Sequence, residues 1–170
     1  MIARLLSTCA LALLLAAGPA AAQEIEVPAW FKHSFLDLRD DLREATAQRR
    51  HLMLFFHLNG CPYCKRMVEE TFRDPPVVAA MKKGFDAVDL NVRGNREVTA
   101  LDGKALSERD YVSQIKVRGT PTILFFDAQG RTVLRLTGFQ PPQTFLAALD
   151  YVAGGAYRTE PDFQRYLKSR

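Results

Sequence analysis

One stretch of the chain decides the fold, Leu52-Met53-Leu54-Phe55-Phe56-His57-Leu58-Asn59-Gly60-Cys61-Pro62-Tyr63-Cys64. Its apolar part, residues 52–58, is short and bounded like a buried strand, and residues at helical spacing follow the cysteines. Pro62 suits the first turn of a helix, where its missing N–H is not needed. Because the N–H groups and dipole at a helix start favour a thiolate, we predict that Cys61 is the acidic, reactive thiol and Cys64 its buried resolving partner. Two such thiols form a redox couple.

Residues 1–22 have the pattern of a secretory signal peptide. A short basic start precedes an apolar segment from Ala10 to Ala17, and Ala20-Ala21-Ala22 forms a small-residue cleavage site. The apolar segment is too short for a comfortable membrane span, and Cys9 lies too early to be the cysteine of a lipoprotein. We therefore expect cleavage after Ala22, no stable membrane anchor and a periplasmic location, where disulfides form and persist.

The expected mature chain, residues 23–170, retains two cysteines, because Cys9 is removed with the signal. A chain of about 150 residues makes one ordinary domain with its own core, so we expect a single domain. The whole chain has a net charge of +4, and its acidic and basic side chains are interspersed, as in residues 39–44. That distribution is typical of solvated helix faces and argues against nucleic-acid binding.

Apolar periodicity, caps and turn residues divide the chain into helices and strands. Ser34 and Asp37 resemble a capping box, which predicts a first helix over about 34–50 with Phe35 on its apolar face. The other expected elements are strands at 51–58, 85–92, 121–127 and 131–137, helices at about 62–72, 107–116, 141–153 and 162–168, a short amphipathic segment ending at Gly84, and a loop with a small hairpin over 93–106. This order predicts an α/β fold, with a central mixed sheet, helices on both faces, a leading helix and a C-terminal helical extension.

A second motif, Val117-Arg118-Gly119-Thr120-Pro121-Thr122, stands before the expected hairpin. Together with the strand, the CxxC pair and the helix, this segment resembles the thioredoxin fold over residues 35–153. In that superfamily the proline peptide bond is cis and lies beside the disulfide, where the preceding residue pairs with an extended substrate. The resemblance therefore implies that Thr120 and Pro121 bind substrate next to the cysteine pair.

Within the superfamily, the chain is most similar to the SoxW-type exported proteins of bacterial sulfur-oxidation systems. The features that carry this finer resemblance are Asn59-Gly60-Cys61-Pro62-Tyr63-Cys64-Lys65, the loop around Leu101-Asp102-Gly103-Lys104, the Thr-Pro segment and the tail beginning Tyr151-Val152-Ala153. The resemblance implies a reductant of client protein disulfides, with thiol-bearing components of sulfur oxidation as clients. A membrane thiol-electron transporter would recharge it, because the exported compartment lacks a soluble reductant such as NADPH.

Two features depart from cytosolic thioredoxin. Phe55 stands where thioredoxins bury an aspartate that helps to deprotonate the resolving thiol, and Pro62-Tyr63 replaces Gly-Pro. One hypothesis is that Asp89 faces the same cavity and replaces that acid; the alternative is that Asp89 faces solvent and water serves instead. His57 is either a group that stabilises the thiolate or the partly exposed end of a strand. Tyr63 is expected beside the disulfide, where it would tune partner contact and redox poise.

The chemistry that follows is thiol–disulfide exchange, which needs no metal or organic cofactor. Two alternatives stay within this chemistry: the clients are the haem-motif cysteines of apocytochrome c, or the protein is a disulfide-forming oxidant. An alternative from another class is a copper or zinc binding module that uses Cys61, Cys64 and His57. A structural zinc site usually has four ligands, which argues against that module.

Overall fold

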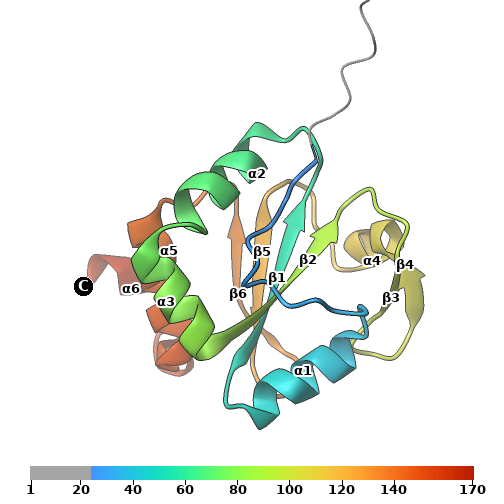
Figure 1. Cartoon of the computed structure of the whole chain (residues 1–170). Coiled ribbons are helices and arrows are strands. Elements are labelled where there is room, and N and C mark those ends of the chain that lie inside the picture. The colour runs from blue at the N-terminus through green and yellow to red at the C-terminus, as the bar shows by residue number, and fades with distance from the viewer. Residues whose placement is uncertain (1–23) are drawn as a thin grey trace, which may run out of the picture.

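The computed structural model describes residues 24–170, which form a four-stranded sheet with helices on both faces (Figure 1). The predicted signal peptide, residues 1–22, lies outside the described residues. The helices are α1 (Leu38–Ala47), α2 (Pro62–Arg66), the π-helical segment η1 (Met67–Thr71), α3 (Pro75–Gly84), α4 (Glu108–Gln114), α5 (Pro142–Ala153), the 3₁₀ turn η2 (Ala156–Arg158) and α6 (Phe163–Lys168). The strands are β1 (His51–His57), β2 (Phe85–Asn91), β3 (Glu97–Thr99), β4 (Ala105–Ser107), β5 (Thr122–Phe126) and β6 (Thr132–Thr137).

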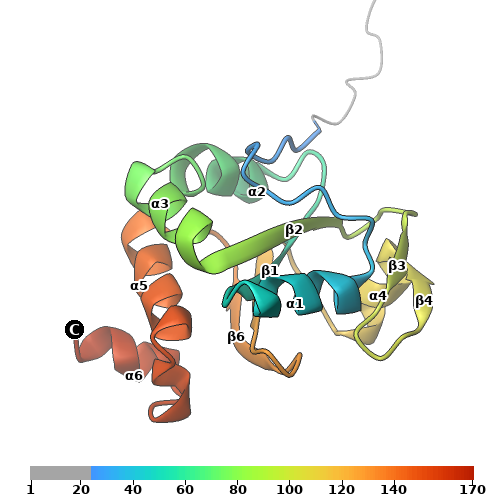
Figure 2. The ribbon, with the colours of Figure 1, turned by 60° about the horizontal axis from the view of Figure 1, so that its bottom comes forward.

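The sheet has the strand order β2-β1-β5-β6. Strand β1 pairs in parallel with β2 and antiparallel with β5, and β5 pairs antiparallel with β6, so the sheet is mixed. Strands β3 and β4 form a separate antiparallel hairpin. Figure 2 shows α5 and α6 together at one end of the molecule and this hairpin at the other. The predicted α/β architecture, with a leading helix and a C-terminal helical extension, is confirmed.

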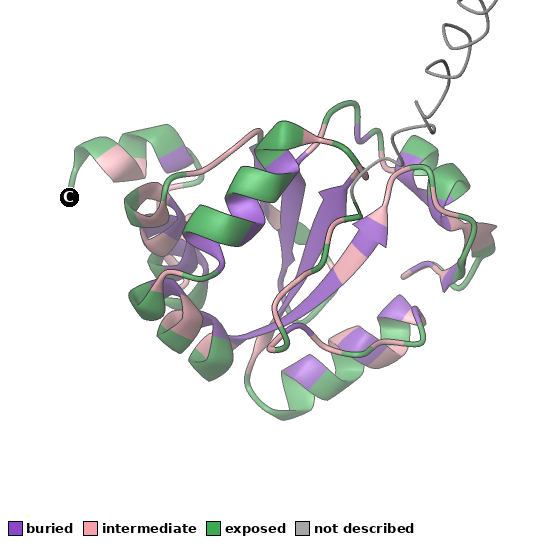
Figure 3. Ribbon diagram, turned by 45° about the horizontal axis from the view of Figure 1, so that its top comes forward, coloured by how far each residue is buried: buried purple, intermediate pink, exposed green. Residues whose placement is uncertain are grey.

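Strand β1 is buried on both faces of the sheet, which explains its unbroken apolar run (Figure 3). Met53 and Phe55 belong to the core cluster that includes residues of α2, η1, α3 and α5. Leu52, Leu54 and Phe56 belong to a second cluster on the other face, with residues of α1 and α4. Full burial of each such side chain contributes about 1.5–3 kcal/mol. Packing on both faces therefore holds β1 in place, and the cysteine motif begins just after the end of this strand.

The start of the first helix differs from the sequence prediction. Helix α1 begins after Asp37, whose carboxylate accepts the first free N–H groups, so Ser34 is not the cap. Phe35 was expected on the apolar face of the helix, but its side chain is fully exposed. The backbone is held elsewhere, because the N–H of Thr99 donates to the carbonyl of Leu36 at 2.8 Å and pairs this segment with β3. Leu36 also has a left-handed φ of 63°, so this segment does not form an additional helical turn.

The remaining boundaries lie closer to the prediction. The expected hairpin is present as β3 and β4, and Ser107 caps α4 by accepting the N–H of Asp110. The first helix ends at Ala47 instead of near residue 50, because Arg49 adopts a left-handed φ of 59°. The motif helix runs on as η1, in which the N–H of Phe72 donates to the carbonyl of Met67.

Candidate redox site

The cysteine motif begins where β1 leaves the sheet and the chain turns into α2. Gly60 has a φ of 78°, in the left-handed region that glycine adopts without steric cost, and this turn leads to Cys61. Cys61 is the N-cap of α2, and its Sγ accepts the backbone N–H of Cys64 at 3.2 Å. Pro62 occupies the first turn of the helix, as the sequence predicts. The local sequence thus places one sulfur at the helix start and the other one turn later.

The two cysteines are free thiols that differ in exposure and in partners. Cys64 is fully buried, whereas Cys61 is partly exposed. The thiol of Cys64 donates to Cys61 Sγ at 2.7 Å, and the hydroxyl of Thr120 donates to the same sulfur at 3.4 Å. Donors therefore converge on Cys61, and hydrogen bonds of this kind strengthen when the acceptor carries a negative charge.

These surroundings shift the pKa values of the two thiols in opposite directions. Partial burial opposes ionisation of Cys61, but hydrogen bonds from the Cys64 thiol, the Thr120 hydroxyl and backbone N–H groups outweigh it, so its pKa falls below 9.0. Burial raises the pKa of Cys64 to about 12, and its hydrogen bond to Cys61 adds to the increase. The pair therefore combines an accessible, more acidic thiol with a buried one that stays protonated at neutral pH.

The Thr120–Pro121 peptide bond is cis and lies directly beside Cys61. The Sγ atom of Cys61 is 3.7 Å from the carbonyl oxygen of Thr120, although 59 residues separate the two in sequence. Pro121 is buried, and its carbonyl accepts the N–H of Gly138 at the end of β6. The fold thus brings together the two motifs that the sequence analysis singled out.

The position of the usual buried aspartate is occupied by an aromatic side chain. Phe55 is fully buried, lies edge-on to Phe31 and Phe72, and stacks on the ring of His57 with centroids 5.6 Å apart. Cys64 belongs to the same core cluster as Phe55. The buried thiol therefore has apolar surroundings, which disfavour its charged form.

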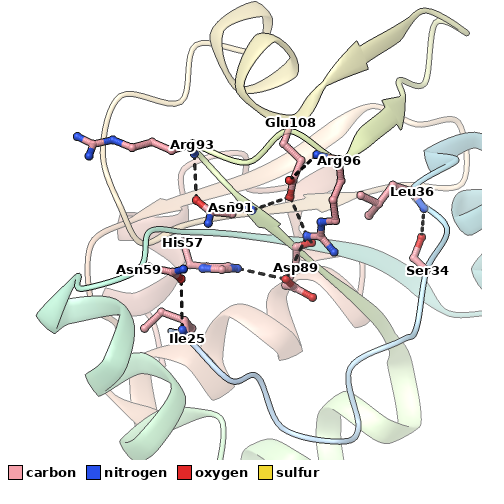
Figure 4. A network of polar contacts seen from close by, with 10 residues as sticks. All are labelled: Ile25, Ser34, Leu36, His57, Asn59, Asp89, Asn91, Arg93, Arg96 and Glu108. Atoms are coloured by element: carbon pink, nitrogen blue, oxygen red, sulfur yellow. Dashed lines mark hydrogen bonds and ion pairs between the residues drawn. The ribbon is translucent and has the colours of Figure 1, made fainter. Parts of the chain in front are cut away.

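His57 and Asp89 form a hydrogen-bonded pair at the ends of β1 and β2 (Figure 4). Phe55 and Asp89 are register partners in these parallel strands, so their side chains share one face of the sheet. His57 Nε2 lies 3.1 Å from Asp89 Oδ2, and Arg96 Nη2 lies 3.4 Å from the same oxygen. Asp89 therefore lies on the same face of the sheet as Phe55, and its carboxylate is bonded to His57 and Arg96.

The protonation of Asp89 determines which nitrogen of His57 carries a hydrogen. Burial opposes ionisation of Asp89, but the hydrogen bond and charge of His57, assisted by Arg96, outweigh it and lower the pKa of this carboxyl below 3.8. An ionised carboxylate only accepts hydrogen bonds, so Nε2 of His57 is the donor. The His57 side chain is 6% exposed, and its Nδ1 has no partner among residues 24–170.

Glu108 is a residue that sequence analysis missed. Its side chain is 1% exposed, and its carboxylate accepts the N–H of Asn91 at 2.9 Å and the N–H and Nη2 of Arg96 at 3.2 and 2.7 Å. Figure 4 shows these bonds beside the His57–Asp89 pair. Residue type gives no signal for this role, because a glutamate in the first turn of a helix is also an ordinary surface pattern. Glu108 thus fixes the segment that follows β2, including Arg96.

The outer part of the motif is open to solvent. Tyr63 is 58% exposed, and Pro62 is exposed beside it. Within residues 24–170, no three Cys, His, Asp or Glu side chains gather as ligands for a metal ion, so the three side chains of the metal-binding alternative do not form such a set. In the same part of the chain, every helix is too short or too polar to cross a bilayer.

A mixed sheet of this order, a CxxC pair at the start of the helix after β1 and a cis-proline beside it define the thioredoxin-fold thiol:disulfide oxidoreductases. The chain belongs to the Thioredoxin-like domain family, whose family model matches residues 38–153.

Known proteins similar to this chain include enzymes of the same chemistry. The thiol:disulfide interchange protein DsbD of Ralstonia nicotianae is 37% identical over 124 residues, which are 72% of this chain and 19% of the relative. The chain thus spans about a fifth of that relative's length. A thioredoxin-fold protein from Helicobacter pylori has a TM-score of 0.59 and 26% identity, covering 71% of this chain and 80% of its own. A thioredoxin from Thermus thermophilus has a TM-score of 0.56 and 28% identity, covering 73% and 90%.

Proposed function

We propose that this protein is a periplasmic reductant of protein disulfides that uses Cys61 and Cys64 as its dithiol couple. The observation that carries the proposal is the asymmetry of the thiols, in which hydrogen-bond donors converge on the accessible Cys61 while Cys64 is buried. The similarity to a thiol:disulfide interchange protein supports the same exchange chemistry. The signal-like residues 1–22, followed by a single domain over 23–170, support export.

In the proposed reaction, the Cys61 thiolate attacks one sulfur of a client disulfide, and the other client sulfur leaves as a thiolate. Cys64 then loses its proton and attacks Cys61 Sγ, which lies 2.7 Å away, so the second client sulfur leaves. The client gains two electrons and two protons, and the protein keeps a Cys61–Cys64 disulfide. Thr120 and Pro121 would hold the client backbone beside Cys61, and the exposed ring of Tyr63 would contact the client.

The second step needs a base, because burial raises the pKa of Cys64 to about 12. We assign this role to His57, with Asp89 holding the ring in the tautomer that leaves Nδ1 as the acceptor. Two observations support the assignment: Nδ1 is buried without a partner among residues 24–170, and the ring stacks on Phe55, which occupies the position of the usual acid. His57 would then replace the acid that thioredoxins bury at the position of Phe55.

For the partners, we propose that a membrane thiol-electron transporter reduces the oxidised pair. The argument is chemical, because a compartment without NADPH must supply electrons through another protein. The resemblance to SoxW-type proteins supports thiol-bearing components of sulfur oxidation as clients, with apocytochrome c cysteines as the alternative.

The test is the reduction potential of the Cys61–Cys64 pair, measured by equilibration in glutathione or dithiothreitol buffers. A reductant should have a value near that of thioredoxin, about −270 mV, whereas a value near about −120 mV would identify a disulfide-forming oxidant and overturn the proposed direction. Reduction of insulin disulfides measures the activity itself. The Cys61→Ser variant should lose it, and Cys64→Ser should accumulate mixed disulfides.

A further inference from the structure

A cleft of about 450 Å³ opens beside Cys61. Its volume lies within the range of about 300–1,000 Å³ that is typical of small-molecule pockets. Residues 24–26 line the cleft on one side, and side chains of α2, η1 and Arg73 line it on the other. Cys61 itself is a lining residue, so a ligand in the cleft would lie next to the accessible sulfur.

The first side of the cleft belongs to the N-terminal strap, which we define as residues 24–33. Figures 1 and 2 show the described chain beginning beside the turn that leads into α2. The N–H of Ile25 donates to Oδ1 of Asn59 at 3.3 Å, in that same turn (Figure 4). The indole N–H of Trp30 donates to the carbonyl of Phe72 at 3.1 Å, just beyond η1. The strap is therefore hydrogen-bonded both to the turn before the cysteine motif and to the segment just after η1.

The strap lies outside the part of the chain that the family shares. The family model matches residues 38–153, whereas the strap ends at residue 33. One side of the cleft thus lies outside the residues that the family model matches, and its ligand has to be inferred from its own residues.

The two sides of the cleft differ in charge. Glu24 and Glu26 line it from the strap, and Arg73 lines it beyond the end of η1. Between them, Lys65 and Glu69 face each other on the helix, with Nζ and Oε1 3.8 Å apart. A ligand that carries both an ammonium and a carboxylate would match this arrangement, because each group meets a side chain of opposite charge.

We propose that the cleft binds small amino-acid disulfides of the cystine type and presents their S–S bond to Cys61. This inference rests on the proposed function, since it uses the same dithiol. Ile25 and Val68 would contact the methylene groups of the ligand, its ammonium would lie near Glu24 and Glu26, and its carboxylate would lie near Arg73.

The reaction balances as two exchange steps. The Cys61 thiolate attacks one sulfur of cystine, and one cysteine leaves as a thiolate that takes a proton from water. Cys64 then loses its proton and attacks Cys61 Sγ in the mixed disulfide, so the second cysteine leaves as a thiolate and takes up a proton. One cystine is reduced to two cysteines while the Cys61–Cys64 dithiol becomes a disulfide. The membrane thiol-electron transporter proposed above would reduce this disulfide again.

The test compares four disulfides with different charged groups. Reduced protein, freed of reductant, is mixed with cystine, with cystamine, which has only ammonium groups, with dithiodipropionate, which has only carboxylates, or with uncharged bis(hydroxyethyl) disulfide. Acid quenching and alkylation measure the rate of Cys61–Cys64 oxidation. Each rate is divided by the rate with the uncharged disulfide, which cancels changes in the intrinsic reactivity of Cys61.

Each side of the cleft has a variant and a matched control. Arg73→Gln removes the charge that would attract a carboxylate. It should lower the relative rates with cystine and dithiodipropionate by a factor about two to five times larger than the factor for cystamine. The double variant Glu24→Gln/Glu26→Gln should lower the rates with cystine and cystamine more than the rate with dithiodipropionate. Arg109→Gln and Glu97→Gln, at exposed positions outside the cleft, change charge by the same amount per site and should leave the relative rates unaltered. These differences should shrink at about 1 M salt, where the screening length is about 3 Å.

Two results would count against separate parts of the reasoning. Equal effects of cleft and control variants on all four disulfides, in a protein that reduces insulin, would overturn the cystine proposal alone. A wild-type protein that fails to reduce insulin disulfides would overturn the proposed function on which it rests.

Discussion

Glutamine in place of Glu108 would keep the shape of this side chain while removing its charge. The native carboxylate accepts three hydrogen bonds, one from the N–H of Asn91 and two from Arg96, and the side chain is 1% exposed. In Glu108→Gln, an NH₂ group replaces one of the two accepting oxygens. Each of the two oxygens accepts one backbone N–H, from Asn91 or from Arg96. In either orientation of the amide, one of these buried N–H groups therefore faces the NH₂ group and loses its acceptor.

The cost follows from these contacts. A buried donor without its acceptor costs about 1–3 kcal/mol. Loss of the ion pair adds about 1 kcal/mol or less, because the Arg96 side chain is 51% exposed and can turn to water. Glu108→Gln should therefore destabilise the protein by about 1–4 kcal/mol, a large part of the about 5–15 kcal/mol that stabilises a typical domain.

Urea unfolding at neutral pH, followed by the fluorescence of Trp30, measures this loss. For a slope of about 2 kcal/mol per molar urea, the midpoint should fall by about 0.5–2 M. Glu97→Gln removes the same charge from an exposed position on β3, and as a control it should change stability by less than about 0.5 kcal/mol. A Glu108→Gln protein within about 1 kcal/mol of wild type would refute the reasoning, because an unpaired buried donor cannot cost less than that.

The same carboxylate can be displaced from the other side. A Cβ atom on Gly94 would clash with Oε2 of Glu108 and would lie 3.1 Å from the carbonyl oxygen of Asn91. Gly94→Ala should therefore break the same hydrogen bonds and destabilise the protein by a similar amount. Because both substitutions act on one set of contacts, the double variant should cost less than the sum of the two. Full additivity would show that Gly94 does not act through Glu108.

The remaining predictions concern the thiols. In the reduced protein, the rate at which iodoacetamide labels Cys61 should reach half its maximum at a pH below 9.0, while Cys64, with a pKa of about 12, stays unlabelled. Mass spectrometry of the peptides measures both rates, and equal labelling of the two thiols would contradict the assigned roles. His57→Gln should slow the release of client from its mixed disulfide by about tenfold or more, because general base catalysis is lost, without slowing the first attack by Cys61. Quenched-flow measurement of both steps checks this, and an unchanged release rate would remove His57 from the mechanism.

Sequence analysis succeeded where the signals are local. The apolar run before the motif, the proline after Cys61 and the Ser107 cap depend on neighbours a few residues away, so they predicted β1, α2 and α4. It failed at the start of the first helix, because Ser34 and Asp37 fit a loop before the helix as well as a capping box. There the bond from Thr99 to Leu36, between segments far apart in sequence, overrides the local pattern.

The residues alone predict a CxxC pair at a helix start, a Thr-Pro segment at the spacing of one fold, and a phenylalanine where that fold buries an acid. Only the tertiary structure decided which side chains surround the thiols. Strand register places Asp89 against His57 across 32 residues, the packing of α4 buries Glu108, and the strap forms one side of the cleft beside Cys61. The physical reason is that local propensity sets the path of the backbone, whereas the partner of a side chain depends on which distant segments pack against each other.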